Sequence, residues 1–142
     1  MKFKIIIYIF ILAIFLGCSS DDTPFGNTVK LTSLKCDLNE KSCENDNKVI
    51  FEISPRPILA MQKHTLKIKG LQNNFKNPIA VFKGVNMYMG DIKTPLRFEN
   101  GEFIGEFALS FCVMNTMRYR IEIYDNDEPS GIFIEFDVFA KK

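Results

Sequence analysis

The segment that decides the fold is GEFIGEFALSFCVMNTMRYRIEIY, residues 101–124. Apolar and polar residues alternate in its first part, 101–111, and again in its last part, 118–124. Because successive side chains of a β-strand point to opposite faces, this alternation is typical of a strand with one buried face. The segment therefore predicts two strands, and their inward-facing residues are Phe103, Gly105, Phe107, Leu109 and Phe111, and then Tyr119, Ile121 and Ile123.

The same alternation recurs on both sides of this segment. It predicts further strands at residues 29–35, 48–54, 65–71, 78–83 and 132–139. Turn-forming residues separate these strands, and no segment after the first 17 residues has a convincing helical period. About seven short alternating strands predict an all-β fold, an antiparallel immunoglobulin-like β-sandwich.

The N-terminus has the features of an export signal. Lys2 and Lys4 are followed by an unbroken apolar run of 13 residues, 5–17, which is too short to span a bilayer comfortably and is typical of a signal peptide. The run ends in Phe15-Leu16-Gly17-Cys18, which resembles the lipobox of bacterial lipoproteins. The resemblance implies that residues 1–17 are a signal peptide and that Cys18 is acylated. The alternative is a plain secretory leader with a structural cysteine.

The predicted domain organisation follows from this start. Residues 18–28 hold the lipidated cysteine and a flexible polar tether, and residues 29–142 form the sandwich. We expect the chain in the bacterial cell envelope, attached to a bilayer through acylated Cys18 and facing the periplasm, on either the outer or the inner membrane. Because Lys2 and Lys4 lie in the leader, the rest of the chain carries one more negative than positive charge. This balance gives no reason to expect binding to nucleic acid.

Two nearby cysteines, Cys36 and Cys43, predict a disulfide, because an exported protein lives in an oxidising compartment. Closing so short a loop would stabilise the fold by about 2.5 kcal/mol in the chain-entropy model. The alternatives are two free thiols, or a pairing of either cysteine with Cys112. Local pairing leaves Cys112 without a partner within the chain.

A cluster of soft side chains is the main candidate for function. Four of the five methionines after Met1 lie between residues 85 and 117, together with Cys112. Thioethers and a thiolate are the ligands that suit Cu(I). If the segment after Gly84 lies beside the Cys112 segment, up to five ligands converge, and the predicted site is Met87, Met89, Cys112, Met114 and Met117. The alternative is that these methionines and Cys112 pack in the hydrophobic core, a role that also suits methionine. Met117 in particular falls in register with the inward face of its strand.

Residues 54–124 contain four short motifs: Ser54-Pro55-x-Pro57, Phe82-x-Gly84-x-Asn86-Met87-x-Met89-Gly90, Gly101-x-Phe103-x-Gly105 and Leu109-x-x-Cys112-x-x-x-x-Met117. With these motifs the segment resembles the FixH/YtkA-like group of small exported immunoglobulin-like domains. The resemblance implies a sandwich fold. It also implies a role in copper handling or in the assembly of haem-copper oxidases, with which some members are associated.

No enzyme motif is present, and Cys112 has no identifiable base, so we expect a non-enzymatic protein. The single histidine, His64, is expected at the surface. Two functions follow from these features. The first is a membrane-anchored domain that binds Cu(I) through the methionine and cysteine cluster. The second is a structural or protein-interaction lipoprotein with an envelope partner, in which the methionines pack the core.

Overall fold

The computed structural model describes residues 31–72, 74–110 and 116–140. These residues form strands and loops, and none of them forms a helix, so this part of the chain holds no helical segment able to cross a bilayer. The strands are β1 (Cys43–Glu44), β2 (Ile50–Ser54), β3 (Lys63–Lys69), β4 (Pro78–Gly84), β5 (Ile92–Pro95), β6 (Arg97–Glu99), β7 (Glu102–Ala108), β8 (Thr116–Asp125) and β9 (Glu128–Phe139).

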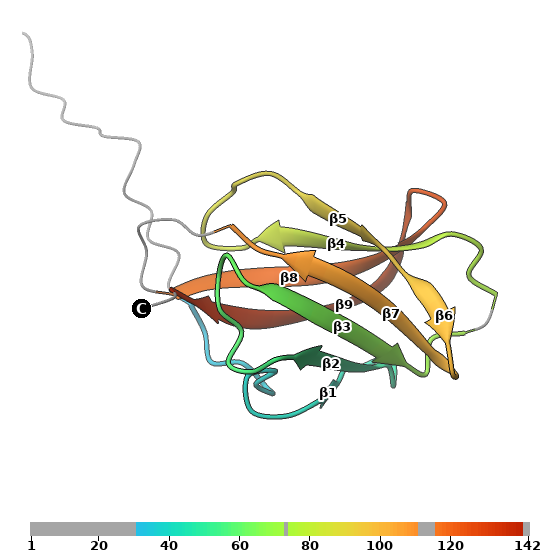
Figure 1. Ribbon diagram of the computed structural model, residues 1–142, viewed down its shortest axis with the longest axis horizontal. Coiled ribbons are helices and arrows are strands. Elements are labelled where there is room, and N and C mark those ends of the chain that lie inside the picture. The colour runs from blue at the N-terminus through green and yellow to red at the C-terminus, as the bar shows by residue number, and fades with distance from the viewer. Residues whose placement is uncertain (1–30, 73, 111–115, 141–142) are drawn as a thin grey trace, which may run out of the picture.

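The strands make two antiparallel sheets that pack as a β-sandwich (Figure 1). One sheet has the order β1-β2-β3-β7-β6, and the other has the order β5-β4-β8-β9. Only Leu96 separates β5 from β6, so the chain passes from one sheet to the other within a single residue. The predicted all-β antiparallel sandwich is confirmed.

The strand order also bears on the immunoglobulin-like prediction. Strands β2-β3-β7-β6 opposite β4-β8-β9 follow the A-B-E-D and C-F-G order of immunoglobulin sandwiches. The hydroxyl of Tyr119, near the start of β8, donates to the carbonyl oxygen of Ser110 at 3.0 Å. A tyrosine with this backward bond at the corresponding corner is a hallmark of those domains. The immunoglobulin-like assignment stays a prediction, supported by this order and this bond.

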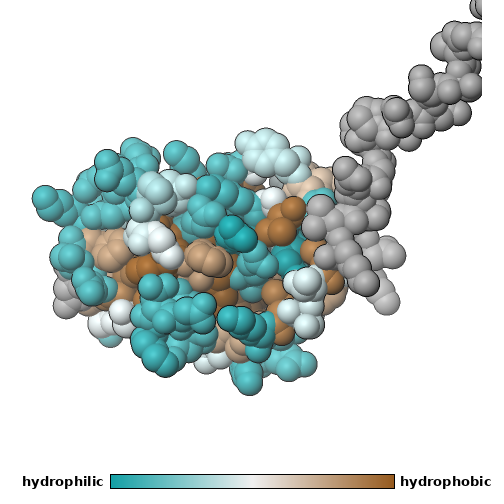
Figure 2. Space-filling model, turned by 180° about the vertical axis from the view of Figure 1, so that it is seen from behind, coloured by the Kyte–Doolittle hydropathy of each residue, from teal (hydrophilic) through white to brown (hydrophobic). Residues whose placement is uncertain are grey.

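The core lies between the sheets and includes the inward-facing side chains that alternation predicted on β7 and β8, together with loop residues such as Leu38 and Ile58. Phe107 of β7 is 4% exposed and stacks on Phe82 of β4, with ring centroids 4.3 Å apart. On β8, Tyr119, Ile121 and Ile123 are all at most 1% exposed. Figure 2 shows one face of the outside, where hydrophilic residues cover most of the surface and hydrophobic ones show between them.

Six of the seven expected strands are present, and the first is wrong. Residues 31–35 are not in a sheet, and residues 29–30 lie outside the described part. The segment alternates, but the carbonyl of Thr32 accepts from the Arg118 guanidinium at 2.5 Å instead of from a neighbouring strand. Three short strands, β1, β5 and β6, were not predicted, since runs of two to four residues show no readable alternation.

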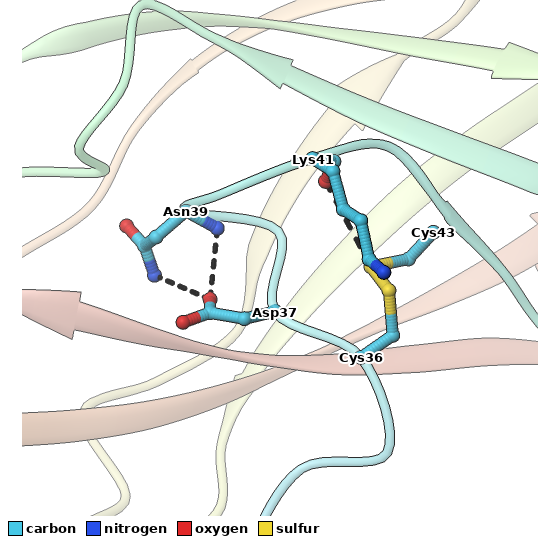
Figure 3. Close-up of a disulfide and its surroundings, with 5 residues drawn as sticks. All are labelled: Cys36, Asp37, Asn39, Lys41 and Cys43. Carbon is cyan, nitrogen blue, oxygen red and sulfur yellow. Dashed lines mark hydrogen bonds between the residues drawn. A yellow bond between two sulfur atoms is a disulfide. The ribbon is translucent and has the colours of Figure 1, made fainter.

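The predicted disulfide between Cys36 and Cys43 is confirmed, and Asp37 and Asn39 lie in the loop that it closes (Figure 3). Within the loop, Leu38 is fully buried in the core. The Asp37 carboxylate accepts from the main-chain N–H of Asn39 at 2.8 Å and from its side-chain amide at 3.1 Å. This contact fixes the direction of the Asn39 side chain.

The fixed amide of Asn39 joins β9 to the β2–β3 connection, two segments that also meet at the isolated bridge between Leu59 and Phe139. Its Nδ2 donates to the carbonyl oxygen of Asp137 in β9 at 2.9 Å, and its Oδ1 accepts from the N–H of Ile58 at 2.7 Å. Asn39 therefore connects the edge of β9 to the β2–β3 connection.

Replacing Asn39 by alanine removes both bonds and leaves the Ile58 N–H and the Asp137 carbonyl without this partner. We expect the free energy of unfolding to fall by about 1–3 kcal/mol. The measurement is urea unfolding followed by circular dichroism. Asn47→Ala is the matched control, because the Asn47 side chain is exposed, and it should change stability little. Equal stability of the two variants would contradict the bridging role of Asn39.

Candidate functional site

The loop between β4 and β5 carries Met87 and Met89 and is held against the start of β8. The N–H of Val85 donates to the carbonyl oxygen of Arg118 at 2.8 Å. The Asn86 side chain donates to the carbonyl oxygen of Thr116 at 3.1 Å and accepts from the N–H of Arg118 at 2.9 Å. Since Thr116 directly follows residues 111–115, the loop lies beside one end of the segment that carries Cys112.

The described methionines differ in burial. Met87 is half-buried and packs against the core, whereas Met89 is 41% exposed. Residues 85–91 form a loop, so the two side chains need not point the same way. Met117 is fully buried beside Tyr119 and Ile121, as its register predicted. Cys112 and Met114 lie outside the described residues.

A fourth methionine, Met61, lies at the other end of the same segment. Its N–H donates to the carbonyl oxygen of Leu109 at 2.8 Å, and its side chain is 75% exposed. Loops that carry methionines therefore adjoin residues 111–115 on both flanks. Figure 1 shows the β4–β5 loop, the end of β7 and the start of β8 at the same end of the sandwich, at the left. An exposed thioether is available to a soft cation from solvent, and a buried one is not.

His64 is not at the surface as expected, because β3 begins at Lys63 and places His64 on the inward face with Leu66 and Ile68. Its Nδ1 lies 3.1 Å from the carbonyl oxygen of Pro55, and its Nε2 lies 2.9 Å from that of Leu59. Both nitrogens therefore face main-chain acceptors, and His64 is a structural residue. Among the described residues, no three His, Cys, Asp or Glu side chains come together as a metal site.

Arg118 is a buried ion-pair residue that the sequence did not reveal. Its Nε and Nη2 donate to the two carboxylate oxygens of Asp137 at 2.8 and 3.0 Å. These bonds raise the pKa of Arg118 above its ordinary value, against the opposing effect of burial. The alternation of β8 predicts that Arg118 points to the outer face of the sheet, where a charged residue is ordinary. The sequence therefore gave no sign that Arg118 is buried. Its bond to the carbonyl oxygen of Thr32 shows that the segment around Thr32 covers it.

We compared the chain with known protein families, proteins and structures. No family model, no curated protein and no solved structure matches it. The resemblance to the FixH/YtkA-like group therefore stays a prediction that rests on the residues quoted for it.

Gly84 makes the methionine loop possible, because a Cβ at this position would overlap the main-chain carbonyl oxygen of Met87. We expect Gly84→Ala to force the loop open and to lower the free energy of unfolding by about 1–3 kcal/mol. The measurement is thermal unfolding, together with the NMR shifts of the Met87 and Met89 methyl groups. Lys83→Ala, one residue earlier, is the control for the loop and should leave both methyl shifts in place. Unchanged methyl shifts in Gly84→Ala would show that the loop does not depend on this glycine.

Proposed function

We propose that this chain is a membrane-anchored, non-enzymatic lipoprotein of the bacterial envelope whose sandwich domain binds Cu(I) and acts in copper handling or oxidase assembly. The ligands are Met87, Met89 and Cys112, with Met114 as a further candidate. The observation that carries the proposal is the Asn86 side chain, whose two bonds hold the methionine loop against the start of β8, and β8 begins at Thr116, shortly after Cys112 in the sequence.

The burial of the methionines supports a division of roles among them. The exposed Met89 and the half-buried Met87 suit a site that receives a cation from solvent. Met117 was a predicted ligand, but its full burial among Tyr119 and Ile121 favours a packing role. A thiolate with two thioethers is sufficient for a trigonal Cu(I) site.

Cu(I) binding is tested with the full chain purified from bacterial membranes in detergent, in competition with a chromophoric chelator under reducing conditions. We expect one tight equivalent. Met87→Leu, Met89→Leu and Cys112→Ser should each lower the affinity by at least about tenfold, because each removes one ligand. Leucine keeps the side-chain volume, so loss of affinity is not a packing effect.

The matched control is Met61→Leu, an exposed methionine outside the proposed ligands. It should leave the affinity unchanged. A Cu(I) affinity that survives the combined replacement of Met87, Met89 and Cys112 would refute the proposed site.

The lipid anchor is tested by intact-mass spectrometry of the chain expressed in bacteria. We expect wild-type protein to lack residues 1–17 and to carry acyl groups on Cys18. One acyl chain binds a bilayer only marginally, so stable attachment needs more than one. Cys18→Ala should keep the leader and carry no acyl mass, while Cys112→Ser should be processed like wild type. A wild-type chain that begins after Cys18 would exclude the anchor.

The second candidate function is an interaction lipoprotein whose methionines pack the core. The burial of Met117 and the contact of Met87 with the core favour it. A partner recovered from envelope extracts with equal yield with and without copper would support it over the Cu(I) proposal.

A further inference from the structure

One end of the sandwich gathers exposed apolar side chains. Of the six large hydrophobic side chains that are exposed in the described part of the chain, four lie at this end: Met61, Tyr88, Met89 and Phe139. Phe139 pairs with Thr116 in the β8–β9 ladder, and its carbonyl oxygen accepts from the N–H of Ala60 at 3.0 Å. The Asn86 side chain holds the β4–β5 loop to the carbonyl of the same Thr116. The four side chains therefore share one end of the molecule, at the left in Figure 1.

The segments that carry these side chains are uncharged. Residues 58–62, 85–90 and 139–140 contain no Asp, Glu, Lys or Arg, although 25% of the residues in the whole chain are charged. Charged residues begin at the rim, with Lys63 and Asp91. Because burying an unpaired charge costs far more than burying an apolar or neutral side chain, this end can leave water at little cost.

The described part of the chain also starts at this end. The Thr32 carbonyl is held by Arg118, two residues after the start of β8, and Figure 1 shows the light-blue start of the chain beside the end of β9. Thr32 lies 14 positions after Cys18, so the chain between them spans at most about 50 Å. Strand β9, with 12 residues, is itself about 40 Å long. If the opposite end faced the bilayer, the connecting segment would need most of its full extension to run along the sandwich.

We propose that this end of the sandwich docks on the lipid bilayer that holds Cys18, with Met61, Tyr88 and Phe139 in the headgroup region. The inference rests on the acyl anchor of the proposed function and not on Cu(I) binding, since Met89 is not needed for the contact. Tyrosine suits this position, because its ring is apolar and its hydroxyl stays in contact with water. Tr anchoring keeps this end near the lipid, so a contact too weak to bind the domain by itself is sufficient to orient it.

The test uses the full acylated chain reconstituted into phosphatidylcholine vesicles, with and without bromine on the lipid acyl chains. The chain contains no tryptophan, so one introduced indole reports its own surroundings. Emission from Tyr88→Trp should shift to the blue and be quenched by the brominated lipid. Phe98→Trp is the matched control, because Phe98 is 53% exposed on β6, at the opposite end of the sandwich in Figure 1. Its emission should stay that of an indole in water, without quenching.

Met61→Trp gives a second reading if Tyr88→Trp fails to fold, and its emission should be quenched in the same way. Flotation of the same vesicles in a density gradient reports the anchor separately. A chain that floats with the vesicles while both indoles stay unquenched would overturn the docking and leave the anchor standing. Equal quenching of Phe98→Trp would also overturn it, since the domain would then have no fixed orientation. A chain that does not float would refute the anchor and the docking together.

Discussion

The structure depends on the hydrogen bonds by which the Asn39 side chain joins strand β9 to the β2–β3 connection. Two sheets packed face to face leave two open sides. On one side, the chain closes the gap by passing directly from β5 to β6 at Leu96, which is 7% exposed. On the other side, among the described residues, the closure is made by main-chain bonds between the β2–β3 connection and Phe139 of β9, and by the Asn39 side chain, which donates to β9 and accepts from the β2–β3 connection. Asp37, in the disulfide loop, fixes the direction of that side chain, and Leu38 of the same loop packs in the core.

Much of the fold follows from the period of two in the sequence. The alternation at 101–109 and at 118–124 corresponds to strands whose inner faces fill the core, and the spacing of Cys36 and Cys43 identified the disulfide. Alternation failed at residues 31–35, because the same pattern suits any extended segment with one covered side. It also failed at β5 and β6, which are too short to show a period and form because the crossing at Leu96 brings them beside β4 and β7.

The candidate site was harder to predict than the fold. Sequence clustering of the methionines identified the loop, and the register of Met117 predicted that it faces the core, but nothing in the sequence showed that Met89 faces solvent. The burial of His64 and Arg118 was missed because neither partner segment is a strand: His64 bonds to Pro55 and Leu59 in the β2–β3 connection, and Arg118 bonds to Thr32, which is distant in the chain.

The exposure of Met61 and Met89 also determines how the protein would age in an oxidising compartment. Oxidation converts a methionine thioether into a polar sulfoxide, and it proceeds fastest where the sulfur meets solvent. Met61 at 75% and Met89 at 41% exposure would react first, while the fully buried Met117 would be protected as long as the sandwich stays folded. A sulfoxide is a harder, oxygen-bearing ligand, so peroxide damage would remove the soft chemistry from the loops and leave the core packing intact.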